Sequence, residues 1–248
     1  TIKENLSLEK RVSITPETAK NIINLGLKVI IENNYATHIG ITDKEYEAIG
    51  VEIKNSSKEV LNNCNLLTKV NCPSDEEISN LKDKTILIGM FNPSKNQSKI
   101  KDIVKKGVHV FSLELLPRIS RAQSMDVLSS QSNLAGYRSV VDSIYEFEKA
   151  IPMMMTAAGT VPAAKVLVIG AGVAGLQAIA TAKRLGAIVS ATDVRAASKE
   201  QVESLGGKFL TVDQSENLET KGGYAKEVSE NFKKKQAEMM KDALKKND

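Results

Sequence analysis

The sequence has no tryptophan and few aromatic residues, and it is poor in the two residue types that most often bind metals. Basic and acidic side chains nearly balance, 34 against 30, and no basic stretch is interleaved with aromatic residues, so nothing favours nucleic-acid binding. Two cysteines, Cys64 and Cys72, are too few for a disulfide framework in a chain of 248 residues, and we expect reduced thiols. His38 and His109 are the only histidines, so no metal-ligand cluster is predicted and no metal is expected.

Long hydrophobic runs are also missing. The longest weakly charged stretch, 150–185, is interrupted by lysines, prolines and glycines, whereas a membrane helix needs about 18 or more apolar residues in a row. No secretory signal is visible. The apolar fraction of 42% is that of an ordinary globular protein, and the length suits two domains.

The first 115 residues alternate short β-branched segments with helical segments. Thr15 followed by proline predicts one helix start, and capping boxes are expected at Thr42 with Glu45 and at Ser74 with Glu77. Such alternation predicts right-handed crossovers and a parallel sheet. The expected strands are 28–32, 51–53, 65–70, 85–90 and 108–113.

A helix over 129–150 separates this part from a second alternating series. There we expect strands at 165–170, 187–193 and 208–212, helices at 173–185 and 196–205, and a charged final helix. We therefore predict an α/β protein with two Rossmann-like parallel-sheet domains, 1–128 and 129–248. The second domain is incomplete at its C-terminus, because a doubly wound dinucleotide domain normally has about six strands. The first segment reads as the tail of a strand, so we expect a fragment cut at both ends.

One glycine-rich turn carries most of the chemical information. Gly170, Gly172 and Gly175 form G-x-G-x-x-G between a predicted strand and a predicted helix, which is the context that makes this pattern specific. The first glycine permits a tight turn, the second lets the backbone approach a pyrophosphate, and the third lets the helix pack close to the strand. The helix N-terminus would then face the phosphates.

An acidic residue ends the second strand of this unit. Asp193 lies 21 residues after Gly172, where a carboxylate accepts hydrogen bonds from the adenosine ribose and repels a 2′-phosphate. This position favours NAD over NADP, although Arg195 could accept that phosphate. FAD, S-adenosylmethionine and a non-binding Rossmann-like unit remain alternatives at this point.

Groups able to move a proton are scarce. His109 fits a core or strand-end residue and His38 a loop, whereas Lys69 and Arg11 stand at the edges of strands or helices, where a parallel sheet opens its binding crevice. Each could equally be a solvated surface charge. Hydride exchange between two nicotinamides would suit this inventory, because it needs orientation of the rings rather than proton transfer. The polar segment 118–126, "RISRAQSMD", carries groups suited to recognition.

Three segments identify a family. "GAGVAGLQAIATAKRLGAIVSATDVR", "RISRAQSMDVLSSQSNLAGYRSV" and "GGYAKEVSENFKKKQAE" closely resemble the NAD(H)-binding alpha subunit, or domain I, of proton-translocating NAD(P) transhydrogenase, a relative of alanine dehydrogenase. The resemblance implies a peripheral subunit on the cytoplasmic side of a bacterial inner membrane. It would bind NAD(H), form a homodimer, and pass hydride to NADP(H) held by domain III. Membrane domain II would couple that exchange to proton movement.

The resemblance also implies roles for particular residues. Arg118, Gln123 and Asp126 would contact and orient the nicotinamide side, with Ser124, Met125 and Ser129 beside them. The phosphate turn would comprise Gly170, Gly172, Val173 and Gly175. The adenosine end would be held by Asp193, Val194 and Arg195, and a mobile loop with Gly223 and Tyr224 would close over the nucleotide.

Two other functions stay open. Alanine dehydrogenase is supported by Arg11 and Lys69, which match that relative's substrate-carboxylate and amine-chemistry positions. Its catalytic histidine would fall within 88–93, where the sequence has none, so the proton relay of oxidative deamination would be missing. A non-catalytic NAD-binding fragment is the third possibility, favoured by the missing strands.

Overall fold

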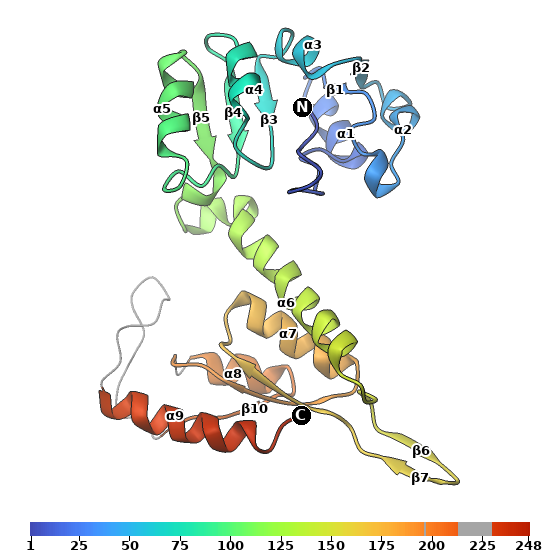
Figure 1. The fold of residues 1–248 in the computed structure, drawn as a ribbon, viewed down its shortest axis with the longest axis vertical. Helices are drawn as coiled ribbons and strands as arrows, with labels where there is room; N and C mark the ends of the chain where they lie inside the picture. Colours follow the sequence, from blue (N-terminus) through green and yellow to red (C-terminus); the bar gives the residue numbers. More distant parts are fainter. Residues whose placement is uncertain (196, 213–229) are drawn as a thin grey trace. The chain divides into compact units, whose positions relative to one another are not determined.

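The computed structural model describes residues 1–195, 197–212 and 230–248 (Figure 1). The chain divides into two compact units, Thr1–Val127 and Leu128–Asp248, and each is described by itself. Both units combine parallel sheets with helices, which confirms the expected α/β class with Rossmann-like sheets.

The first unit follows the predicted alternation of strands and helices. Its strands are β1 (Ile30–Glu32), β2 (Glu52–Lys54), β3 (Leu66–Thr68), β4 (Ile86–Gly89) and β5 (His109–Ser112). Its helices are α1 (Pro16–Asn24), α2 (Asp43–Glu47), α3 (Ser57–Leu61), α4 (Asp75–Asn80) and α5 (Gln97–Lys105). Three 3-10 helices are η1 (Thr37–Ile39), η2 (Leu113–Leu115) and η3 (Ser120–Met125). Of the helices, α3 is not predicted by the sequence pattern, because it has only five residues.

The predicted helix starts have the expected hydrogen bonds. The Thr15 hydroxyl accepts from the Thr18 backbone N–H at 3.3 Å, with proline in the first turn of α1. The Glu45 carboxylate accepts from the Thr42 backbone N–H at 2.7 Å. At α4 both halves of the capping box are present between Ser74 and its partner three residues on. These bonds satisfy N–H groups that a helix start otherwise leaves open.

Residues 1–4 join the sheets of the first unit. β1 and β2 pair in parallel, and β3, β4 and β5 form a separate parallel sheet in that order. The Thr1 nitrogen donates to the Ile30 carbonyl at 2.8 Å, and the Thr1 hydroxyl donates to the Thr68 carbonyl at 2.6 Å. This segment therefore lies between β1 and β3. Ile2, which is 1% exposed, packs there with Leu67 in the core.

The second unit begins with a long helix and contains two sheets. Its elements are α6 (Val127–Glu146), β6 (Met154–Thr156), β7 (Gly159–Val161), β8 (Lys165–Ile169), α7 (Val173–Arg184), β9 (Ile188–Thr192), α8 (Ser198–Ser204), β10 (Lys208–Phe209) and α9 (Glu230–Leu244). Strands β10, β9 and β8 form a parallel sheet in that order, which is the 3-2-1 order of one half of a Rossmann sheet. Its core is built from small and β-branched residues such as Ile179, Val189 and Val202.

Two details of this unit differ from expectation. The strand predicted over 208–212 is paired only at Lys208–Phe209. An antiparallel hairpin, β6–β7, occupies part of a stretch in which the sequence predicts no strand, and it extends away from the parallel sheet (Figure 1). All of its strand residues are exposed, so no buried face marks it in the sequence.

Across the ranges that the structure describes, none of the helices has both the length and the apolar composition needed to cross a bilayer.

Candidate functional site

The glycine turn after β8 has the geometry that its pattern predicts. Gly170 has φ +94°, a left-handed conformation that favours glycine, and its N–H donates to the Thr192 carbonyl at 2.8 Å. A Cβ on Gly175 would collide with the Gly170 carbonyl oxygen, so this glycine permits the close approach of helix and strand. A Cβ on Gly172 would meet nothing within 4 Å. The backbone at Gly172 is thus open to a close neighbour from outside the chain.

Helix α7 starts directly at this turn. Gly172 is its N-cap, and the Leu176 N–H makes the first intrahelical bond, to the Gly172 carbonyl, at 2.8 Å. The N–H groups of the preceding residues have no such intrahelical partner and carry the positive end of the helix dipole. Lys183 and Arg184 lie in the last turn, at the negative end. The turn and helix together fit a phosphate group.

Asp193 follows β9 and reaches back to the glycine turn. Its Oδ2 accepts from the Ala171 N–H at 2.7 Å, and its Oδ1 accepts from the Arg195 backbone N–H at 2.8 Å. The Arg195 guanidinium donates to both carboxylate oxygens, from Nε at 2.9 Å and from a terminal nitrogen at 3.1 Å. Burial works to raise the pKa of Asp193, but the bonds from Arg195 and Ala171 outweigh it, and the pKa lies below its ordinary value. The group is therefore an anion at neutral pH.

The remaining residues expected at the adenosine end are only partly described. Val194 is half-buried between Asp193 and Arg195. Gly223 and Tyr224, expected in a closing loop, lie outside the described residues.

The segment 118–126 is more ordered than the loop that its composition suggests. Most of it forms η3, in which the Ala122 N–H donates to the Ile119 carbonyl at 2.9 Å. Ala122 is buried, whereas Gln123, Ser124 and Met125 are exposed. The helix thus presents these three side chains outward from one small anchor.

The two charged residues that flank η3 approach each other. Arg118 and Asp126 form an ion pair at 3.9 Å, with side chains 55% and 25% exposed. Ser129 lies in the first turn of α6 and is half-buried. An arginine and a carboxylate held at either end of three exposed side chains can recognise a polar ligand by hydrogen bonds.

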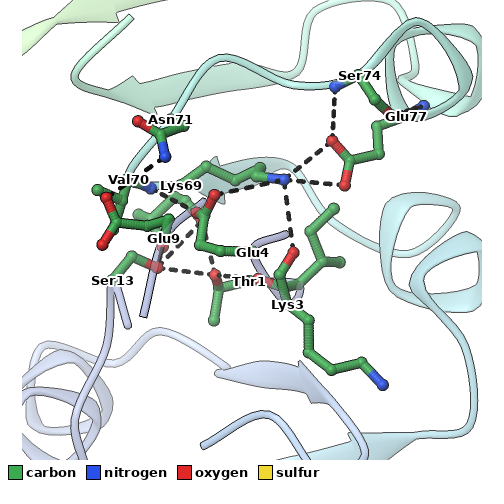
Figure 2. Close-up of polar contacts among 12 residues, drawn as sticks. Thr1, Lys3, Glu4, Glu9, Ser13, Lys69, Val70, Asn71, Ser74 and Glu77 are labelled. Atoms are coloured by element: carbon green, nitrogen blue, oxygen red, sulfur yellow. Dashed lines mark hydrogen bonds and ion pairs between the residues drawn. The ribbon is translucent and has the colours of Figure 1, made fainter. Parts of the chain in front are cut away.

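Lys69 is buried, contrary to both interpretations of it as a charge open to solvent or to a crevice. Its side chain is 4% exposed, and its Nζ donates to both carboxylate oxygens of Glu77 at 2.8 and 2.9 Å (Figure 2). Glu4 lies 3.8 Å from the same nitrogen and accepts from the Val70 N–H at 2.7 Å. Burial raises the pKa of Glu4, although the charge of Lys69 opposes that rise. Internal carboxylates therefore already surround this lysine.

Arg11 is held in a similar way. Its guanidinium pairs with Glu9 through Nε at 2.9 Å and a terminal nitrogen at 2.6 Å, and Asn71 donates to the same carboxylate at 3.4 Å (Figure 2 labels Glu9 and Asn71). The Arg11 hydrogen bond holds the pKa of Glu9 below its usual range. Both candidate cations of the first unit thus have carboxylate partners within the chain.

Both histidines lie at the surface of the first unit. His109 starts β5 and is exposed, so it is a strand-end residue, and His38 lies in η1 with its Nε2 2.8 Å from the Lys10 carbonyl oxygen. The thiols of Cys64 and Cys72 are free, as expected.

Two contributors to the site are missed by the sequence pattern. The Ala171 N–H fixes Asp193, and Gly136 of α6 lies against the first turn of α7, where a Cβ would collide with the Ala174 carbonyl oxygen. A glycine inside a long helix is a signal of close packing, and it could have pointed to this crossing.

The parallel sheet, the glycine turn at a helix start and the carboxylate at the tip of the next strand together define a Rossmann-type nucleotide-binding protein. Residues 1–135 match the family described as alanine dehydrogenase/PNT, N-terminal domain, and residues 139–248 match alanine dehydrogenase/PNT, C-terminal domain. The chain belongs to the alanine dehydrogenase/PNT family, and the resemblance drawn from its motifs is confirmed.

Within that family the chain is highly similar to transhydrogenase subunits. It is 51% identical over 253 aligned positions to a Rhodospirillum rubrum protein named as the first part of NAD(P) transhydrogenase subunit alpha, covering 99% of this chain and 66% of that protein. It is 46% identical to the protein of the same name from Rickettsia prowazekii, covering 96% of this chain and 63% of that protein. This chain therefore spans about two thirds of the length of these relatives.

A solved structure of transhydrogenase from Sinorhizobium meliloti aligns with a TM-score of 0.81 at 49% identity, covering 85% of this chain and 64% of that one. An L-alanine dehydrogenase structure shares the fold with a TM-score of 0.71 at 23% identity, covering 84% of this chain and 58% of that one.

Proposed function

We propose that this chain is the NAD(H)-binding part of a proton-translocating NAD(P) transhydrogenase. The observation that carries the proposal is the phosphate turn with its carboxylate, built as a dinucleotide site requires, in a chain 51% identical to a transhydrogenase alpha subunit. NAD(H) is the nucleotide that such a carboxylate favours.

At the phosphate end, Gly170, Gly172, Val173 and Gly175 receive the pyrophosphate. The open space at Gly172 admits the phosphate oxygens to the backbone, and the first N–H groups of α7 donate to them. Gly175 keeps the helix close enough to β8 for this turn to exist.

At the adenosine end, Asp193 accepts hydrogen bonds from the ribose hydroxyls. Its carboxylate is fixed by the Ala171 N–H, which keeps it at the mouth of the glycine turn. Val194 and Arg195 complete this end, with Gly223 and Tyr224 as the closing loop. The last two are proposed from the family resemblance alone.

At the nicotinamide end, Arg118, Gln123 and Asp126 orient the ring. Gln123, Ser124 and Met125 project from η3 into solvent, where they are available to a ligand, and Ser129 follows in α6. The bound nicotinamide supplies the hydride chemistry, and these side chains supply orientation. Orientation accounts for a large part of the rate of such a transfer, because aligned reactants avoid the entropy of encounter.

The rest of the machinery lies on other domains. We propose that NADP(H) is held by a domain III, that a membrane domain II couples the exchange to proton translocation, and that two copies of this chain's domain pair as a homodimer. The chain would then be peripheral, on the cytoplasmic side of a bacterial inner membrane. The relatives are named as the first of several parts of an alpha subunit, which supports the existence of further parts.

The test is hydride transfer in a reconstituted system. The full-length subunit is mixed with a domain III carrying NADP(H), and reduction of an NAD analogue is followed by absorbance. Transfer that needs both components supports the proposal. The proposal fails if the full-length subunit transfers no hydride while alanine and NAD yield NADH.

Alanine dehydrogenase is the second candidate, favoured by a 28% identical relative of that name from Methanococcus maripaludis. Against it, Arg11 is paired with Glu9 and Lys69 with Glu77, so neither cation is available for a substrate carboxylate as the chain stands. A non-catalytic NAD-binding fragment is tested by the same experiment, because it would bind NADH and transfer nothing.

A further inference from the structure

The adenosine end contains two groups with opposite preferences for a nucleotide. A carboxylate at this position selects the free 2′-hydroxyl of NAD, whereas an arginine beside it is the usual partner of the 2′-phosphate of NADP. Here the two groups are Asp193 and Arg195, two positions apart. In this structure they are bonded to each other.

The bond between them uses the face of the guanidinium that a phosphate would need. Nε and one terminal nitrogen of Arg195 grip the two oxygens of Asp193 at 2.9 and 3.1 Å, which is the two-point geometry in which arginine also binds phosphate. The side chains are 23% and 8% exposed, so solvent screens this pair only weakly. A 2′-phosphate would therefore have to compete with a well-placed internal carboxylate.

The carboxylate cannot easily follow the arginine away from the turn. It also accepts from the Ala171 N–H at 2.7 Å and from the Arg195 backbone N–H at 2.8 Å. These two backbone bonds hold Asp193 while the side chain of Arg195 stays within reach of it. Burial and these bonds together fix the position of the negative charge.

We propose that Asp193 sets nucleotide preference in two ways, by repelling a 2′-phosphate and by holding the Arg195 guanidinium in an internal ion pair. This inference rests on the proposed function, since it concerns the same nucleotide site. Arg195 is then a specificity-determining residue that is kept inactive by its neighbour. Removing the charge of Asp193 should release a phosphate-binding group that the chain already contains.

The inference differs in its consequences from charge repulsion alone. If repulsion were the whole effect, loss of the carboxylate would improve binding of NADP(H) whether or not Arg195 were present. If Arg195 is released, most of the improvement should depend on it. A double-mutant cycle distinguishes the two cases.

The experiment measures Kd for NADH and NADPH by isothermal titration, using the full-length subunit in four forms. These are the unchanged protein, Asp193→Asn, Arg195→Gln and the double variant. We expect Asp193→Asn to weaken NADH about tenfold or more, since it loses a charged acceptor for the ribose hydroxyls. We expect it to tighten NADPH by about tenfold, and the double variant to lose most of that gain. Arg195→Gln alone should leave the weak binding of NADPH nearly unchanged.

Salt provides a second readout for the same variants. The gain of NADPH binding in Asp193→Asn should shrink as ionic strength rises, because it comes from a new charge–charge contact. If Asp193→Asn does not fold, Asp193→Ser with and without Arg195→Gln replaces it, since serine keeps a hydrogen-bonding group near the Ala171 N–H.

Two results would overturn the inference. One is a double variant that binds NADPH as tightly as Asp193→Asn, and the other is a loss of NADPH binding in Arg195→Gln alone. If the unchanged protein binds no NADH, the proposed function itself fails. If it binds NADH selectively and removal of the carboxylate brings no gain for NADPH, only the inference fails.

Discussion

Glu77→Gln should destabilise the first unit by about 3 kcal/mol, because it leaves a buried lysine with one distant partner. Glu77 contacts Lys69 through both oxygens at 2.8 and 2.9 Å, and the lysine side chain is 4% exposed. Breaking one side of a buried ion pair costs about 3–5 kcal/mol. We take the lower end because Glu4 remains 3.8 Å away. Glutamine keeps an oxygen for the Ser74 N–H, so the helix cap contributes little to the loss.

The assay is urea unfolding, combined with hydrogen exchange of the β3 amides, which report on the first unit alone. With a slope near 2 kcal/mol per molar urea, the midpoint should fall by about 1.5 M. Protection of β3 should fall by roughly two orders of magnitude if those amides exchange through global opening of the unit.

Glu76→Gln is the matched control for this change. Glu76 lies in the same first turn of α4 and is exposed, so the substitution removes the same charge from the same helix end without touching Lys69. If Glu77→Gln costs no more than about 1 kcal/mol beyond this control, the lysine is not held by its carboxylate and the argument is refuted.

Three further outcomes are expected. Gly175→Ala should disrupt the turn and lower both thermal stability and NADH affinity, whereas Gly172→Ala, in open space, should keep the melting temperature and lose affinity alone; equal melting curves for the two would contradict this. In the reconstituted hydride-transfer assay, Gln123→Asn should slow transfer far more than it weakens NADH binding, and equal losses would show a binding strap instead. Glu9 has its pKa lowered by Arg11, so its contribution to stability is full above its ordinary value of 4.5 and is lost as pH falls through the lower folded value. Glu9→Gln should therefore flatten the acid side of the urea-midpoint profile between about pH 5 and 3, and an unchanged slope would count against the pairing.

Most of the sheet and helix pattern could be predicted because it is encoded locally. Buried parallel strands are short β-branched runs bounded by glycine or asparagine, and β4 and β8 are of this kind. The capped helix starts at Thr15 and Ser74 depend on residues within one turn. The same holds for the glycine turn, whose three glycines fix its shape almost without help from the rest of the chain.

The elements that escaped prediction depend on other information. The β6–β7 hairpin has no buried face, so its sequence shows no period of two, and its turn depends on Gly159 at φ +138°. Lys69 and Glu77 meet across a strand and a helix, whereas capping is the only role that the spacing of Glu77 indicates. The bond between Asp193 and Arg195 is local, but composition alone could not decide whether the arginine faces its neighbour or a ligand.

The place of residues 1–4 has a consequence for how the first unit is assembled during synthesis. These residues leave the ribosome before their neighbours on either side, Ile30 and Thr68. Ile2 must therefore stay unpaired until both flanking strands exist, and its contacts are among the most distant in sequence within the unit. We expect the sheet to close late, with this early-made segment entering it after its flanking strands.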